Sequence, residues 1–383
     1  MTRMQTWCAI LLAVVLLAMP PAAEAAVTLA LAPAAQNAAR GTQLVFSGTL
    51  TNTSGTEKAF LNDLHATFAG GAGAVLALEP NAFFANVPGI LLPAETYTGV
   101  LFRVTLSAAA APGDYTGTIT VKGGVNIVAG GDLASAPLTI FSPAVSVVAT
   151  DASASEFGPD PGAITISRTG GTDLPLSVPY TLSGSAANGT TYAALPTSAI
   201  IPAGAPAVAI PVTPLPDNLA QGDRTATLSL AVSTAFNPGA AVTAAVTIHD
   251  KPADQWRLEK FGAAANDPEA QDLADWERDG VKNLVEYGLN LDPKAATANA
   301  LPQTDPSSGY ATFSYVPNLA ATDLIYSVEA CADLVNWSTA HLESVLVANP
   351  VPPSRVTVRY DIPITAQERI FFRLNVTRLG GAP

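Results

Sequence analysis

Oxygen-bearing side chains recur at close, regular spacing in the stretch DWERDGVKNLVEY, residues 275–287. Calcium takes six to eight oxygen ligands at about 2.3–2.6 Å, and a short loop converges alternate side chains on one ion only if it turns sharply. Gly280 follows the third acid and permits the positive φ that such a turn needs. The stretch therefore predicts a bound Ca²⁺, with ligands from Asp275, Glu277, Asp279, the carbonyl of Val281, Asn283 and Glu286.

This spacing resembles that of an EF-hand calcium loop, with glycine at the sixth position and glutamate at the twelfth. Glu277 stands where Asp or Asn is usual, and the chain has no second loop to pair with this one. The alternative interpretation is a solvated acidic turn in front of a helix. The helix itself is predicted by apolar residues at helical spacing, and Glu286 would lie on its first turns: Val281, Leu284, Val285 and Leu289.

Residues 251–300 form the segment that must position this loop, and they are richer in charge than the chain before them. Trp256 and Phe261 are helically spaced, which predicts a short amphipathic helix before the loop. Pro293 predicts the end of the helix after the loop. We expect Trp276 to pack on a neighbouring module.

The composition favours turn-rich β modules. The 383 residues are enough for two to four domains. Charged residues make up 13%, about half the usual share. The net charge of −13 and the pI of about 4.5 argue against nucleic acid and anionic membranes as partners, and favour divalent cations.

Alternation of apolar residues with Thr or Gly predicts strands over residues 26–143 and again over 144–250. We interpret each region as a β-sandwich. After a linker at residues 296–308, the alternation resumes and predicts a small C-terminal β domain, residues 301–383. The fold class is therefore mainly β, with tandem immunoglobulin-like β-sandwiches, a short helical calcium-loop segment and a small β domain.

Both sandwiches resemble known modules. NVPGILLPAETYTG and GDYTGTITVKGG, within residues 87–124, resemble an immunoglobulin-like module of exported bacterial surface proteins. VSVVATDASASE, ITISRTGG and the closing VTIHD resemble a Calx-beta domain over residues 144–250. That resemblance implies a calcium-binding face, and three acids match it: Glu156, Asp217 and Asp250.

Four other positions of that face depart from the Calx-beta pattern. They hold no carboxylate, and one adds a positive charge: Thr191, Asn218, Gln221 and Arg224. Loss of hard oxygen ligands lowers affinity for calcium. We therefore interpret Glu156, Asp217 and Asp250 as a degenerate second metal site.

The segment from WRLEKFG to LNLDP, residues 256–293, resembles the single calcium loop of the thrombospondin type 3 or dockerin kind in exported proteins of Verrucomicrobia. DLIYSVEACADLVNW and RIFFRLNVT resemble the small β domain that follows it there. A cohesin-binding dockerin carries two loops, so the single loop argues against that mode of docking.

The N-terminus predicts export. Arg3, an apolar run at residues 7–18 and small residues at 23–25 predict a cleaved signal peptide, residues 1–25. We expect a secreted or cell-surface protein with no membrane insertion after cleavage. Cys331 is then the one remaining cysteine; we expect a small buried strand residue, with a reactive or intermolecular thiol as the alternative.

No catalytic pattern stands out. The three histidines lie in separate segments, and the chain lacks HExxH, GxSxG and P-loop motifs. We expect no enzyme but a calcium-binding surface or extracellular matrix protein whose calcium rigidifies a joint between β modules. A hydrolase with two acids in one cleft stays open.

The alternative is a carbohydrate-binding or cell adhesion protein, whose partner would be a cell-surface polysaccharide or another surface protein. A sugar platform needs exposed aromatic side chains, and the candidates are Tyr192, Trp276 and Tyr310. Neither the ligand nor the oligomeric state follows from the sequence.

Overall fold

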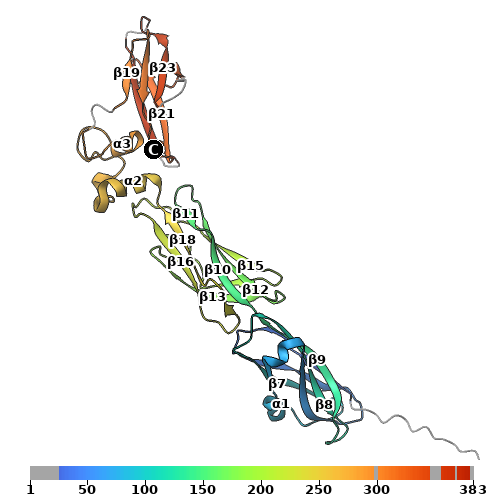
Figure 1. The fold of residues 1–383 in the computed structure, drawn as a ribbon. Coiled ribbons are helices and arrows are strands. Elements are labelled where there is room, and N and C mark those ends of the chain that lie inside the picture. The colour runs from blue at the N-terminus through green and yellow to red at the C-terminus, as the bar shows by residue number, and fades with distance from the viewer. Residues whose placement is uncertain (1–25, 297–300, 346–354, 367–368, 380–383) are drawn as a thin grey trace, which may run out of the picture. The chain divides into compact units, whose positions relative to one another are not determined.

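The computed structural model describes residues 26–296, 301–345, 355–366 and 369–379, drawn in colour in Figure 1. The predicted signal peptide lies outside the described residues. The described chain is mainly β, as the sequence predicts, and it divides into two compact units. The described residues of the first unit lie within 26–144, 168–176 and 233–237, and those of the second lie within 145–167, 177–232 and 238–379.

The first unit contains a β-sandwich of two sheets, with strand orders β1-β3-β7-β5 and β2-β9-β8-β4-β6. Alternate residues of its strands point into one apolar core, in which the rings of Phe46 and Phe102 stack at 5.1 Å. The strands are β1 (Val27–Leu31), β2 (Ala35–Asn37), β3 (Gln43–Asn52), β4 (Ala59–Phe68), β5 (Leu76–Glu79), β6 (Ile90–Leu91), β7 (Thr96–Leu106), β8 (Gly113–Gly124) and β9 (Gly131–Ser142). The helices are η1 (Gly70–Ala74) and α1 (Asn81–Asn86).

The second unit opens with the sandwich predicted over residues 144–250. Its sheets have the orders β15-β12-β10-β17 and β11-β18-β16-β13-β14. Burial alternates along β12, as expected for a strand with one face in a core. The strands are β10 (Ala144–Asp151), β11 (Ser153–Ser155), β12 (Gly162–Thr169), β13 (Leu176–Ser183), β14 (Ser198–Ile201), β15 (Ala207–Val212), β16 (Arg224–Leu230), β17 (Asn237–Pro238) and β18 (Thr243–His249).

The helical segment follows β18. It comprises α2 (Pro252–Phe261), η2 (Gly262–Ala264), η3 (Pro268–Ala270) and α3 (Asn283–Leu289). Both predicted helices are present, and α3 ends at Asn290, whose left-handed conformation (φ 53°) stops the helix before Pro293.

The C-terminal region pairs β19-β20-β23-β22 in one sheet and β21-β24 in another. The bounds are β19 (Gln303–Asp305), β20 (Tyr310–Tyr315), β21 (Leu324–Cys331), β22 (Leu342–Ser344), β23 (Val356–Pro363) and β24 (Phe371–Arg378). β19 lies inside the predicted linker, so that linker is not wholly unstructured. Cys331 is free and buried at the end of β21, as predicted.

A small core ties the helical segment to both of its neighbours in the second unit. Ala220 comes from the sandwich, Trp256 and Phe261 from α2, Tyr287 from α3 and Leu324 from β21. The helical segment thus packs against the sandwich and the C-terminal strands and is not a free linker between them. No helix among the described residues is both long and apolar enough to span a membrane.

Candidate calcium site

Acidic side chains of the loop before α3 stabilise its turn by accepting hydrogen bonds from its backbone. Asp275 accepts hydrogen bonds from the backbone N–H groups of Asp279 at 3.1 Å and Gly280 at 2.8 Å. Asp279 accepts one from the N–H of Val281 at 2.8 Å. Gly280 has φ +95°, the positive value that the sequence predicts for the sharp turn.

The turn brings four carboxylates together. Asp275, Glu277 and Asp279 each place an oxygen within 4.8 Å of the other two. Glu286, which is 0% exposed on α3, faces the same three acids. Burial, together with repulsion from Glu277, Asp279 and Asp275, raises the pKa of Glu286 to about 8.

Several oxygens of this cluster are buried without a donor. Both carboxylate oxygens of Glu277, both of Glu286 and Oδ1 of Asn283 have no hydrogen-bond partner in the part of the chain that is described. Leaving a buried polar atom unpaired costs about 1–3 kcal/mol, and more when it is charged. A divalent cation would satisfy these hard oxygens together, so the donor set fits calcium.

Asn283 is oriented by its amide nitrogen. Nδ2 donates to the carbonyls of Glu269 and Gln271, both at 2.9 Å, which leaves Oδ1 as the unpaired atom. The structure thus gathers the four predicted carboxylates and leaves the amide oxygen of Asn283 unpaired. Val281, the predicted backbone ligand, lies in the turn directly after Gly280.

Aromatic side chains hold the loop against the helices. Trp276 packs on Phe261 with ring centroids 4.8 Å apart, and Trp256 lies 5.3 Å from Tyr287. Lys294 lies 5.9 Å from the ring centres of both Phe261 and Trp276. Trp276 is therefore packed as predicted, but its ring contacts are with Phe261 and Lys294 of its own segment rather than with a neighbouring module.

A charge network that the sequence does not reveal fixes the same loop to the C-terminal strands. Arg378 of β24 donates two 2.7 Å bonds to Asp272 and one of 3.3 Å to Asp323. Asp323, 3% exposed, also accepts from the Tyr287 hydroxyl at 2.6 Å and from the N–H of Ala253 at 3.1 Å. Asp272 lies only three residues before Asp275, so the network reaches the edge of the calcium loop.

The acids of the predicted second site also lie near one another, but they already accept hydrogen bonds from protein donors. Asp250 accepts the N–H groups of Gln221 at 2.7 Å and Gly222 at 2.6 Å. Burial raises the pKa of Glu156 to about 7; the N–H of Asp217, 3.4 Å away, opposes this shift. The ammonium group of Lys251 contacts the carbonyl of Asp217 and donates to Oδ1 of Asn218 at 3.1 Å.

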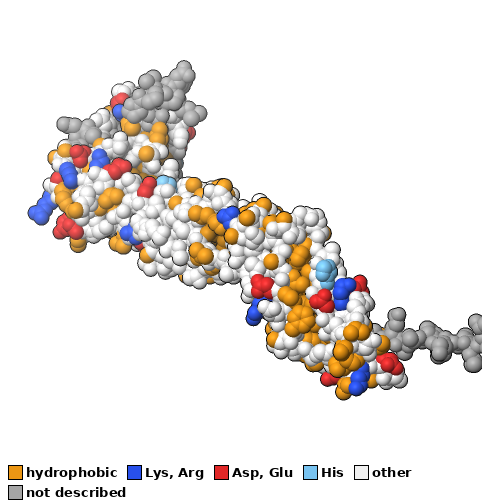
Figure 2. All heavy atoms as spheres, turned by 60° about the horizontal axis from the view of Figure 1, so that its bottom comes forward, with side chains coloured by type: hydrophobic (Ala, Val, Ile, Leu, Met, Phe, Trp, Pro, Cys, Tyr) orange, Lys and Arg blue, Asp and Glu red, His pale blue; other side chains and the backbone are white. Residues whose placement is uncertain are grey.

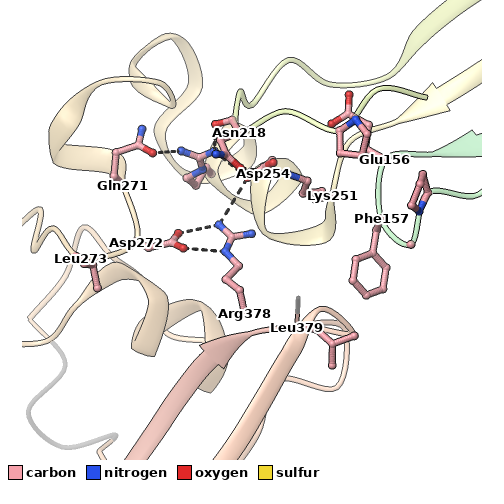
Figure 3. A pocket seen from close by; sticks show the side chains of 14 residues that line it. Glu156, Phe157, Asn218, Lys251, Asp254, Gln271, Asp272, Leu273, Arg378 and Leu379 are labelled. Atoms are coloured by element: carbon pink, nitrogen blue, oxygen red, sulfur yellow. Dashed lines mark hydrogen bonds and ion pairs between the residues drawn. The ribbon is translucent and has the colours of Figure 1, made fainter. Parts of the chain in front are cut away.

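A cavity of about 860 Å³ lies beside Glu156 and Lys251. Figure 3 shows Arg378 extended toward Asp272 there, and Glu156 beside Phe157. Asp254 and Arg257, two buried residues of α2, form an ion pair of 2.7 Å at its wall. Its charged groups are thus largely paired within the protein.

The aromatic residues predicted for a sugar platform do not form one. Tyr192 is 1% exposed, so its prediction as an exposed platform residue is wrong. Tyr310 lies under the guanidinium of Arg359 at 4.9 Å. The large exposed apolar side chains of the described residues include no Trp or Tyr.

The surface carries charges of both signs. On the face drawn in Figure 2, Lys and Arg side chains are scattered among acidic ones and form no broad basic surface.

Comparisons with solved structures return β-sandwich proteins. The apo-form Calx CBD1 domain is 18% identical over 28% of this chain and 96% of its own, with a TM-score of 0.24. The Calx CBD2 domain is 13% identical over 30% and 93%, with a TM-score of 0.24. The I9–I11 tandem of titin is 6% identical over 91% and 94%, with a TM-score of 0.25.

No protein-family model matches the chain, and no curated protein matches it. The TM-scores above all lie below 0.5, so the sandwich folds rest on the strand pairings described earlier.

Proposed function

We propose that this chain is an exported, non-enzymatic, multi-module protein that binds one Ca²⁺ in the loop before α3. The observation that carries the proposal is Glu286. It is fully buried, both of its oxygens lack a donor, and three further acids face it. A fold retains such a group in its charged form at low cost only if a cation neutralises it; without a cation the group holds a proton.

The position of the loop gives the ion a structural task. The core shared by Ala220, Trp256, Tyr287 and Leu324 joins the second sandwich to the C-terminal strands. α3 belongs to that core through Tyr287, and Glu286 is the residue directly before Tyr287. Calcium on Glu286 would therefore hold the loop, α3 and the joint in one arrangement, and would stabilise the folded state by binding it alone.

Calorimetric titration of the whole chain with CaCl₂ tests the site. We expect one ion with a dissociation constant on the order of 10⁻⁴–10⁻³ M, the range of extracellular calcium modules. Asp279→Ala and Glu286→Gln should each abolish the heat of binding. Glu259→Gln, an exposed acid on α2, is the matched control and should bind as the wild type does. Binding retained in both loop variants would overturn the assignment.

Limited proteolysis tests the structural task. Addition of EGTA should lower the melting temperature and increase cutting between Lys251 and Ser308. Cutting and melting that are the same in calcium and in EGTA would show that the ion does not order the joint.

A further inference from the structure

The acids of the loop before α3 differ in how many of their oxygens the protein itself already binds. Both oxygens of Asp275 accept backbone N–H groups, and Oδ1 of Asp279 accepts another, so these bonds form the turn. Both oxygens of Glu277 and both of Glu286 accept no hydrogen bond from the described residues. The two glutamates therefore keep all of their oxygens for a ligand.

These two glutamates come from different elements. Glu277 lies in the turn, and Glu286 lies on α3, where it is 0% exposed. Their carboxyl groups face each other. Asn283, which is 1% exposed on the first turn of α3, adds an unpaired Oδ1. The turn and the helix thus supply several oxygens that are buried without a donor, two from each glutamate and one from Asn283.

The number of these oxygens distinguishes between the two common divalent ions of this kind. Ca²⁺ takes six to eight oxygens at about 2.3–2.6 Å in a flexible arrangement, and it binds carboxylates through one oxygen or both. Mg²⁺ is smaller, requires near-octahedral geometry at about 2.0–2.1 Å and keeps several of its waters. A carboxylate that binds through both oxygens spans far less than the right angle between neighbouring ligands of an octahedron. Two such glutamates in one buried site therefore suit calcium and disfavour magnesium.

Glu277 is the position at which this loop departs from the usual EF-hand pattern, because Asp or Asn is usual there. Its side chain is one methylene group longer than that of Asp, and its carboxylate extends to the side of Glu286. An aspartate at this position would carry the same charge and end one methylene group short. The length of the side chain, rather than its charge, is thus what Glu277 adds to the loop.

We propose that Glu277 is the residue that makes this loop selective for Ca²⁺ over Mg²⁺, because it and Glu286 both offer two oxygens to the same ion. This inference rests on the proposed function, since it concerns the choice of ion by the same loop. The protein would then respond to calcium even where magnesium is equally abundant.

The test is a calorimetric titration of the full chain with CaCl₂, with and without about 10⁻² M MgCl₂, which is about ten times the upper end of the expected calcium range. NaCl brings the magnesium-free buffer to the same ionic strength. The calcium dissociation constant of the wild type should be the same in both buffers. In Glu277→Asp magnesium should compete, and the calcium dissociation constant should rise by about threefold to tenfold. Glu259→Asp, the same change at an exposed acid of α2, is the control and should behave as the wild type does.

Two results would overturn the proposal: a wild type whose calcium affinity falls in magnesium, or a folded Glu277→Asp variant whose calcium affinity magnesium does not change. Either result would leave the proposed function intact, because the loop would still bind calcium. A wild type that binds no calcium in either buffer would instead contradict the proposed function, and this inference with it. The wild-type comparison needs no variant, so it decides the selectivity even if Glu277→Asp does not fold.

Discussion

At the scale of single residues, Glu286 shows how the loop is destabilised when no ion is bound. A fully buried carboxylate among three other acids is destabilised in its charged form, and its pKa rises from 4.5 to about 8. Calcium must displace the proton that this shift retains, so calcium affinity should increase with pH.

The same shift predicts the pH dependence of the metal-free protein. The folded state keeps the proton of Glu286 up to about pH 8, whereas the unfolded chain releases it near 4.5. In EGTA the contribution of Glu286 to the free energy of unfolding should therefore be largest below pH 4.5 and should decrease as the pH rises to 8, which is measured as the difference between the wild type and Glu286→Gln. Denaturant unfolding across this range measures it. Glu286→Gln should flatten the profile; identical profiles for the two proteins would contradict the assignment.

Gly280 carries a second prediction at this scale. Its φ is +95°, and an added Cβ would meet no other heavy atom within 4 Å. Gly280→Ala therefore introduces backbone strain without a clash, and should destabilise the loop by about 1 kcal/mol. Calorimetry should show weaker calcium binding. Gly55→Ala, where space is open and φ is ordinary, is the control and should have little effect.

At the scale of elements, Arg378 is the residue that joins β24 to the helical segment. It is 21% exposed and serves Asp272 and Asp323, the second of which is buried. Arg378→Met should leave these acids without their cation and cost about 3 kcal/mol of stability. Arg359→Met is the control, because its pair with Glu343 is 42% and 53% exposed and solvent screens it, so its loss should change stability little. Equal losses in thermal unfolding would refute the special role of Arg378.

The elements that the sequence predicts are those with a strong period. β3, β7 and β8 alternate over ten or more residues, and α2 and α3 carry apolar residues at helical spacing. Short strands such as β6 and β22 span two and three residues, too few for a period to be read, and they exist because a neighbouring strand pairs with them.

The conformation of the acidic loop was predictable because its proposed ligands lie within twelve residues of one another, and local spacing then determines geometry. The partners of that loop were not. Arg378 reaches Asp272 across 106 positions of the chain, and Asp323 reaches Tyr287 across 36. Contacts at such separations depend on how the strands and helices pack, which a single sequence does not encode in any local pattern.

At the scale of the whole molecule, the two compact units predict two separable responses to calcium. The first unit has its own apolar core and contains none of the predicted ligands. Calcium at ten times its dissociation constant should stabilise the second unit by about 1.4 kcal/mol and leave the first unchanged. Scanning calorimetry in EGTA and in calcium measures both transitions. A shift of both by the same amount would mean that the units unfold together.

The docking of α2 on the second sandwich has a consequence for how this protein tolerates change. Lys251, Arg257 and Asn266 all hold the stretch 217–220 chiefly by its main-chain atoms. Every amino acid has these main-chain atoms. Residues 217–220 can therefore be substituted without loss of these hydrogen bonds, whereas the polar side chains that bond to them cannot. In a set of diverged homologues, the loop would vary, and Arg257 of α2 with the flanking residues Lys251 and Asn266 would stay constant.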